Sequence, residues 1–430
     1  MTLQDSTAEP LPGAHYNPVP PARRHPVVFA RQGKDFLKLS VRGAALQFVT
    51  FGFYRFWLTT DVRRHLWSHT SVDGAPLEYL GRGKELLIGF LFALAILTPI
   101  YLLYFLAGLE AERLKAFASI PLFIFFYLFG QFAIYRARRY RLTRTIWRGV
   151  RFGMEGSGWS YSWRASLWGL GVLFTLGALY PWRAAALERF KMRHTHYGDL
   201  KGEFIGDGWT FFKKGWWMWA ICLVGFLALM GMPFIGLVLQ ELKKQGVAVD
   251  FGRFGDYKAL LFIAVPCLIA TPFLWTMFRA LEWRWWASNI RFGEIDIASD
   301  LPKSSILILY LKFYVILSLV SSVVSVLMIA IGAAVLEVMG ISMSAKASEF
   351  QAFAANHNFI FVGGMMAMYL FAGLVVGIVQ RFFLQHELWR IIASSLTIGN
   401  VEAADHVIVQ GDVVNALGEG LADSLDVAGF

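Results

Sequence analysis

Hydrophobic residues along the chain gather in long uninterrupted runs, instead of alternating with polar residues as they do in soluble folds. A helix needs ~20 apolar residues to cross a hydrocarbon core of about 30 Å. Six runs reach that length: 85–107, 117–136, 215–240, 257–280, 304–336 and 358–383. The pattern predicts six membrane-spanning helices.

Two further apolar stretches, 43–60 and 165–183, are shorter, and each contains a central glycine, Gly52 or Gly177. Segments rich in arginine and lysine flank both of them, and such segments favour the cytoplasmic side of a membrane. A full crossing would place the two flanking segments on opposite sides. We therefore expect each stretch to bend at its glycine and return, or to lie at the interface, and eight full spans are the alternative.

The composition changes this picture little but adds a charge asymmetry. Hydrophobic residues make up 57% of the chain and charged residues 16%, whereas a globular domain carries about 25% charged residues. The net charge is +10, and the cations cluster beside the predicted spans. This distribution predicts cytoplasmic termini and contact with lipids, chiefly anionic headgroups at the cytoplasmic face, rather than with nucleic acid. A homo-oligomer is left open.

Part of the chain repeats itself at an offset of 125 residues, the separation of Gly52 from Gly177. The matched residues of the first copy are Gly52, Trp57, Arg64, His69, Thr70, Glu78 and Gly81, and those of the second are Gly177, Trp182, Arg189, His194, Thr195, Glu203 and Gly206. A second match places Arg284 on Arg390. Because the basic loops recur with the same character, the repeats should be parallel in the membrane.

The expected fold is an all-α polytopic membrane protein with parallel internal repeats of helix pairs, two short re-entrant or interfacial segments and small cytoplasmic hairpins. One hairpin turn is expected at Val72, Asp73 and Gly74. The predicted divisions are a disordered tail at 1–30, membrane repeats at 34–153 and 159–303, a shortened third repeat at 304–402, and an acidic tail at 403–430.

The repeated residues from Thr50 to Gly83, and again from Thr175 to Gly208, resemble the YjgN-like family of bacterial inner-membrane proteins. The shared pattern is a Thr-Leu-Gly-x-Tyr-x-x-Trp run, an arginine-rich stretch, a His/Asn-Thr pair, and a glycine before the first long span. Neither copy carries the whole pattern, since Phe51 replaces its leucine and Leu179 its tyrosine. The resemblance implies a multi-pass protein of the bacterial inner membrane, from a family whose domain is of unknown function.

The candidate binding residues are His69, Glu78, His194, Glu203, Arg284 and Arg390. A histidine with a neighbouring carboxylate could relay protons or bind a cation, and arginines at span ends could hold phosphate. The alternatives are structural: the His-Thr pair ends a helix, the Glu anchors a hairpin, and the arginines fix orientation. His65 and His69 are spaced for one metal, but Phe190 occupies the matching position of the second copy, so no metal is expected.

No sequence motif for phosphate loops, hydrolase nucleophiles or dinucleotides is present, so neither an enzyme nor a cofactor is predicted. Parallel repeats, with Pro99 and Pro233 in matching spans, favour a small-solute or ion transporter or channel. The alternative is a lipid-contacting or scaffolding envelope protein. A transporter should have a polar cavity continuous with the cytoplasm inside its helices.

Overall fold

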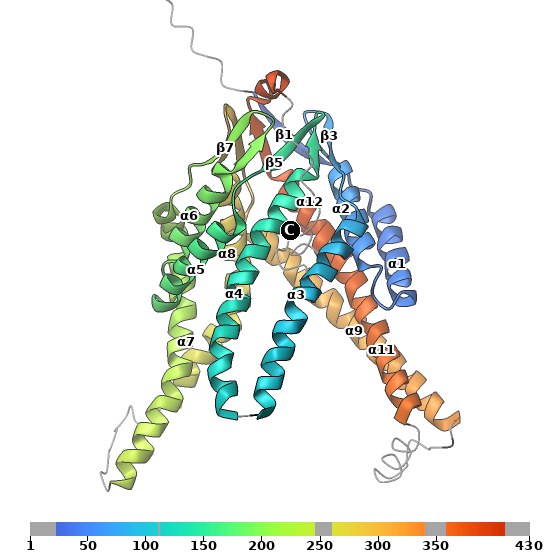
Figure 1. Cartoon of the computed structure of the whole chain (residues 1–430), viewed down its shortest axis with the longest axis vertical. Helices are drawn as coiled ribbons and strands as arrows, with labels where there is room; N and C mark the ends of the chain where they lie inside the picture. Colours follow the sequence, from blue (N-terminus) through green and yellow to red (C-terminus); the bar gives the residue numbers. More distant parts are fainter. Residues whose placement is uncertain (1–22, 111, 246–259, 339, 341–357, 409–430) are drawn as a thin grey trace, which may run out of the picture.

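The computed structural model describes residues 23–110, 112–245, 260–338, 340 and 358–408. Residues 1–22 and 409–430, which belong to the two predicted tails, lie outside the described part. Helices and β-hairpins alternate along the chain, and the strands meet at one end of the molecule while the long helices extend from it (Figure 1).

Ten short antiparallel strands form a closed barrel, in the order β1-β10-β9-β8-β7-β6-β5-β4-β3-β2. Their bounds are β1 Arg24–Phe29, β2 Thr70–Val72, β3 Ala75–Tyr79, β4 Thr145–Trp147, β5 Val150–Met154, β6 Thr195–Tyr197, β7 Leu200–Phe204, β8 Ile290–Phe292, β9 Ile295–Ser299 and β10 Leu396–Gly399. Four hairpins supply eight strands, and β1 pairs with β10 to close the ring. The predicted all-α fold is therefore wrong.

The physical reason for this error is that each hairpin looks like an ordinary loop when taken alone. The strands of the four local hairpins are only three or five residues long, and a two-stranded hairpin has little stability by itself in water. The barrel arises from pairing between hairpins, such as Leu77 with Trp147 and Gly202 with Phe292. Residues 24–29, expected in a disordered tail, form the strand that closes it.

Apolar side chains from several strands form one cluster in the barrel interior, among them Val27, Val72, Trp147, Tyr197 and Ile295. Tight turns keep the strands in register, because both central residues of the β2–β3 turn, Asp73 and Gly74, and of the β4–β5 turn have positive φ. The short 3-10 helix η4 (Val401–His406) packs on the same core and covers the barrel end that points away from the long helices (Figure 1).

In the described part of the chain, five pairs of helices extend from the barrel. Three pairs are long: α3 (Gly83–Glu110) with α4 (Glu112–Thr143), α7 (Gly208–Lys244) with α8 (Leu261–Ala287), and α9 (Lys303–Val338) with α11 (Asn358–Val379). A π-helical segment, η3 (Gln380–His386), joins α11 to α12 (Glu387–Ser394). Six of the described helical stretches are long and apolar enough to cross a membrane, which indicates a membrane protein.

The other two pairs are short: α1 (Gly33–Val49) with α2 (Arg55–Ser68), and α5 (Gly158–Phe174) with α6 (Tyr180–Arg193). They lie beside the barrel end of the molecule (Figure 1). Each pair bends at a glycine with positive φ, Gly52 at 90° or Gly177 at 95°. In both turns the glycine N–H donates to a carbonyl five residues earlier, at 2.7 Å. The stretches 43–60 and 165–183 thus form helical hairpins with a bend at the predicted place.

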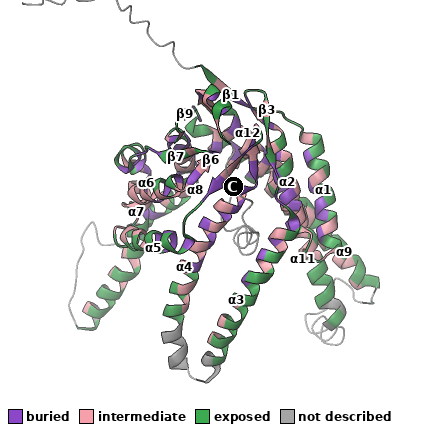
Figure 2. Cartoon of the chain, turned by 45° about the horizontal axis from the view of Figure 1, so that its top comes forward, coloured by how far each residue is buried: buried purple, intermediate pink, exposed green. Residues whose placement is uncertain are grey.

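Burial is concentrated around the barrel and the helix ends next to it (Figure 2). In the most apolar window of each candidate span, at most 22% of the residues are buried within the chain. The long helices therefore present most of their apolar side chains outward, as expected when lipid covers them. Several buried polar side chains, among them Thr70, Thr145 and Thr195, lie at the junction between barrel and helices.

Candidate functional site

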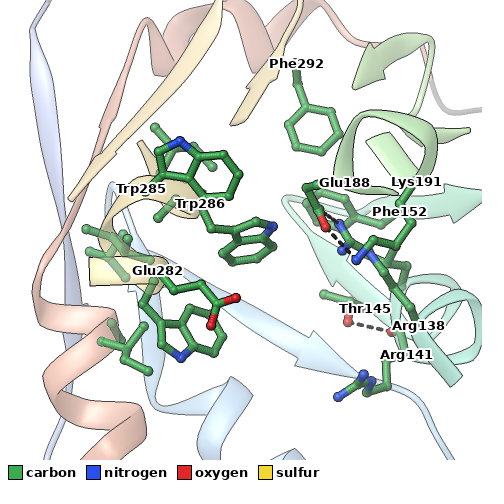
Figure 3. Close-up of a pocket in the computed structure, with 18 of the residues that line it drawn as sticks. Arg138, Arg141, Thr145, Phe152, Glu188, Lys191, Glu282, Trp285, Trp286 and Phe292 are labelled. Carbon is green, nitrogen blue, oxygen red and sulfur yellow. Dashed lines mark hydrogen bonds and ion pairs between the residues drawn. The ribbon is translucent and has the colours of Figure 1, made fainter. Parts of the chain in front are cut away.

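A cavity of about 750 Å³ lies at this junction, beneath the open end of the barrel. Its walls come from α2, α4, α5, α6, α8 and α12 and from inward-facing residues of the strands. Figure 3 shows charged side chains of α4 and α6 facing tryptophans and a carboxylate of α8 across the open space. The cavity therefore joins segments that lie more than 200 residues apart in the sequence.

The charged side chains that line the cavity all come from three neighbouring helices. They are Arg138 and Arg141 of α4, Arg183, Glu188 and Lys191 of α6, and Arg279 and Glu282 of α8. Five cations thus face two carboxylates, an excess of three positive charges among the charged groups that line it. Such an excess is costly to enclose in a medium of low dielectric constant unless an anion joins it.

Glu188 is the centre of the first ion-pair cluster. Its carboxylate lies 2.7 Å from the Arg138 guanidinium and 2.5 Å from the Lys191 ammonium, and the residue is 4% exposed. Burial alone would raise the pKa of Glu188, but the two cations outweigh burial and lower the pKa to about 2. Burial lowers the pKa of Lys191, against the opposing effect of Glu188. Glu188 is therefore ionised at neutral pH and neutralises part of the surrounding charge.

Glu282 forms a second cluster on α8. It accepts a hydrogen bond of 2.5 Å from the Tyr180 hydroxyl and pairs with Arg279 on the same helix. Burial, reinforced by the neighbouring Glu282 carboxylate, raises the pKa of Tyr180 far above its usual value. Tyr180 therefore stays protonated and acts as a hydrogen-bond donor.

Arg183 differs from the other cavity cations in its bonding. It lies one helical turn from Leu187 and two turns from Lys191, so all three side chains form one stripe of α6 facing the cavity. Its Nε is buried and makes no hydrogen bond within the described part of the chain. The Arg183 guanidinium lines the cavity and has no ion-pair partner in the described part of the chain, so it is suited to donate to an anionic oxygen placed there.

Tryptophans form the rest of the wall near these charges. Trp283, Trp285 and Trp286 come from the end of α8, whereas Trp67 and Trp389 come from α2 and α12. Trp67 stacks on Trp389 at a centroid distance of 4.5 Å, and the Arg138 guanidinium lies 5.7 Å from the Trp286 ring centroid. The cavity thus combines charged and aromatic side chains, which suits an amphipathic molecule.

The two repeated histidines do not line the cavity. His69 lies at the end of α2 with Nδ1 2.6 Å from the His65 carbonyl oxygen, and His194 lies at the end of α6 with Nδ1 2.7 Å from the Phe190 oxygen. The following Thr70 also donates to a carbonyl of its preceding helix. These contacts terminate the helices. No group of three His, Cys, Asp or Glu suited to a metal occurs among the described residues.

The remaining candidate binding residues lie apart from one another. Glu78 and Glu203 are exposed on β3 and β7, facing away from the barrel interior. Arg284 is exposed at the end of α8, and Arg390 pairs with Glu387 at 2.7 Å. The structure brings none of them to the cavity.

The repeated structural residues make equivalent contacts in both copies. The Arg64 guanidinium donates to the Gly81 carbonyl at 3.2 Å, and the Arg189 guanidinium donates to the Gly206 carbonyl at 3.0 Å. Trp57 and Trp182 pack so closely on the glycines that begin α3 and α7 that a Cβ there would lie about 2.8 Å from them. Thr195 bonds back to its helix as Thr70 does. These residues fix the hairpin beneath each helix.

Sequence reasoning missed the charges of the cavity because it searched the positions that repeat. A usable signal existed: Arg279 and Glu282 are three residues apart near the end of an apolar span, and ionisable residues there often mark a site. Glu188 and Lys191 have the same spacing on α6. These charged residues meet in one cavity only because the barrel brings α4, α6 and α8 together.

The chain belongs to the family described as bacterial protein of unknown function (DUF898), whose model matches residues 24–424. This match confirms the resemblance carried by the Thr50–Gly83 pattern. No curated protein and no solved structure matches the chain.

Proposed function

We propose that this member of the DUF898 family is a lipid-contacting membrane protein that binds an anionic amphiphile in the cavity beneath its barrel. The observation that carries the proposal is the composition of that cavity, whose lining combines five cations and two carboxylates with several tryptophans. A charged headgroup would contact the cations, and the apolar part of the ligand would contact the tryptophans.

The position of the cavity, near the ends of the candidate spans, supports a ligand that comes from the bilayer. Arg138 and Arg141 lie in the last turns of the candidate span Ser119–Thr143, and Glu282 lies near the end of Leu261–Ala287. The end of a span is where lipid headgroups meet protein, and tryptophan is enriched at that level. A lipid headgroup could therefore contact these side chains while its acyl chains stay in the hydrocarbon layer.

The volume supports the same arrangement. About 750 Å³ is within the ~300–1,000 Å³ of typical ligand pockets, which is enough for a headgroup and the adjoining part of the chains. The outward-facing apolar surface of the spans leaves lipid as their expected neighbour. We further propose that the membrane is the bacterial inner membrane and that the arginine-rich barrel end faces the cytoplasm, with both termini there.

A small-solute transporter is a second candidate, and the position of the cavity favours it. The cavity adjoins the barrel interior, and η4 covers the opposite barrel end. Arg148 holds η4 in place through Asp405, at 2.5 Å, and also pairs with Asp73. Displacement of η4 would be required for a solute to leave by that route.

Two assays on one preparation distinguish these functions. Lipids that remain with the purified protein are identified by mass spectrometry, and solute and ion flux is measured in proteoliposomes. We expect retention of anionic lipid above its share of the membrane, and no flux. Flux of a solute without selective lipid retention would contradict lipid binding and support transport.

A further inference from the structure

We propose that the amphiphile carries a phosphate group, and that Arg183, with Arg138 and Lys191, forms the phosphate-binding part of the cavity. This inference rests on the proposed function and specifies its ligand class. Each of the three cations comes from a helix that ends at the barrel, and each lines the cavity. The site is thus built by the fold rather than by one exposed segment.

Charge balance indicates an anion with more than one negative charge. The two lining carboxylates are already engaged, Glu188 by Arg138 and Lys191, and Glu282 by Tyr180 and Arg279. The lining nevertheless retains an excess of three positive charges. A phosphate monoester carries about −1.5 to −2 charges at neutral pH, more than a carboxylate can supply.

The bonding geometry also favours phosphate. The Arg183 guanidinium lines the cavity and has no hydrogen-bond acceptor or ion-pair partner in the described part of the chain. Guanidinium groups bind phosphate oxygens through two parallel hydrogen bonds, and a phosphate has further oxygens for Lys191 and Arg138. A carboxylate has only two oxygens and would leave part of this donor set unused.

The tryptophans beside the cations indicate that the phosphate belongs to an amphiphile. The Trp286 ring faces Arg138 at 5.7 Å, so a group bound at the cations lies beside an indole surface. Apolar substituents of the ligand would cover that surface, whereas free phosphate would leave it in contact with water. The shared chemistry is a phosphate, and its source is a lipid headgroup.

The test uses the full chain in a nonionic detergent, with tryptophan fluorescence as the binding signal. The probes are dihexanoyl phosphatidic acid, dihexanoyl phosphatidylcholine, laurate and inorganic phosphate. The variants are Arg183→Leu, which introduces the residue found at the matching Leu58 of α2, and Arg183→Lys, which keeps the charge but not the planar donor group. Arg284→Leu, at an exposed position of α8 outside the cavity, is the matched control.

We expect phosphatidic acid to bind most tightly, with affinity reduced about tenfold or more by Arg183→Leu, less by Arg183→Lys and not at all by Arg284→Leu. Thermal unfolding verifies that each variant folds, and Arg183→Gln replaces Arg183→Leu if the latter does not. Equal binding of all three amphiphiles, unchanged in Arg183→Leu, would overturn the phosphate site while leaving amphiphile binding intact.

Two other results have separate meanings. Inorganic phosphate that binds as tightly as phosphatidic acid would support the phosphate site but overturn a lipid source. Absence of binding by every amphiphile, in wild type and variants alike, would overturn this inference together with the proposed function.

Discussion

The two short helical hairpins, α1–α2 and α5–α6, share a framework but differ on the side that meets the cavity. At the offset of 125 residues, Arg183 of α6 replaces Leu58 of α2, and Lys191 replaces Leu66. Leu58 and Leu66 are buried in an apolar cluster with Phe36, whereas the two cations line the cavity. The same backbone plan therefore supports an apolar core in one copy and a charged site in the other.

This difference shows that recurrence marks architecture in this chain. The recurring contacts of Arg64 and Arg189, and of Trp57 and Trp182, hold each hairpin against its helix. The candidate ligand contacts occupy positions where the copies disagree. A repeated polar residue reports a repeated structural requirement, whereas a single site needs residues that occur once.

Loss of the Glu188 carboxylate should have the largest effect on stability. Glu188→Gln leaves Arg138 and Lys191 enclosed without their partner, and we expect a loss of about 3 kcal/mol in unfolding free energy. Thermal unfolding in ligand-free detergent measures it. Glu203→Gln is the control, because this exposed carboxylate should change stability by less than about 0.5 kcal/mol. Equal effects would mean that the buried cluster contributes nothing special.

The close contact between a helix-starting glycine and a tryptophan should make the same contribution to stability in the two copies. Gly83→Ala and Gly208→Ala would place a Cβ 2.9 or 2.8 Å from the Cα of Trp57 or Trp182, so the backbone must shift. We expect each to cost about 1–3 kcal/mol in thermal unfolding. At Gly130 a Cβ meets nothing within 4 Å, so Gly130→Ala should not destabilise. A strong effect in only one copy would break the structural equivalence.

Acid sensitivity should distinguish the copies, because His65 of α2 corresponds to Phe190 of α6. Burial, with His69 and His386 nearby, lowers the pKa of His65 from 6.5 to about 4. Between pH 6.5 and 4, His65 is therefore protonated in the unfolded chain but neutral in the folded protein. The folded protein loses stability as the pH falls through this range.

His65→Phe should remove this loss. The change in unfolding free energy that the substitution causes should be more favourable at pH 5 than at pH 8, by about 1–2 kcal/mol. Thermal unfolding at the two pH values gives the comparison. A difference that is the same at both pH values would show that His65 packs without titrating.

The threonines that follow the helices should show the smallest difference. The Thr70 hydroxyl accepts a 2.9 Å hydrogen bond from Trp389 Nε1 in addition to donating to its own helix, and the Thr195 hydroxyl bonds only to its own helix within the described chain. Thr70→Val should therefore cost about 1–2 kcal/mol and Thr195→Val about 0.5–1 kcal/mol in thermal unfolding. The reverse order would argue against this indole contact.

The sequence predicted the parts of the fold that depend on local composition. The six apolar runs became six candidate spans, because hydropathy requires no partner, and Gly52 and Gly177 form the expected bends. The barrel was missed since strands of three residues, such as Thr70–Val72, have almost no periodicity. Proline-rich composition concealed β1, although Pro26 pairs with Thr397 in the barrel.

The site was missed for a related reason. The arginines and lysines beside the short apolar stretches were interpreted as charges that set orientation, and the spacing of Glu188 and Lys191 does not reveal that Arg138 joins them. The ion pair between Arg138 of α4 and Glu188 of α6 joins helices whose closeness depends on the β5–β6 pairing. A site formed by residues of α4, α6 and α8 can be recognised only when the β-barrel that brings these helices together is known.

Pairing of β1 with β10 has a consequence for biosynthesis. The strand at Arg24–Phe29 leaves the ribosome early, but its partner at Leu396–Gly399 emerges only after every candidate span has been synthesised. Until then the nascent barrel is an open sheet with two unpaired edges. A chaperone, or membrane insertion that holds the growing assembly apart from other chains, would protect those edges, and a ribosome that stalls before residue 396 would release a product prone to aggregation through them.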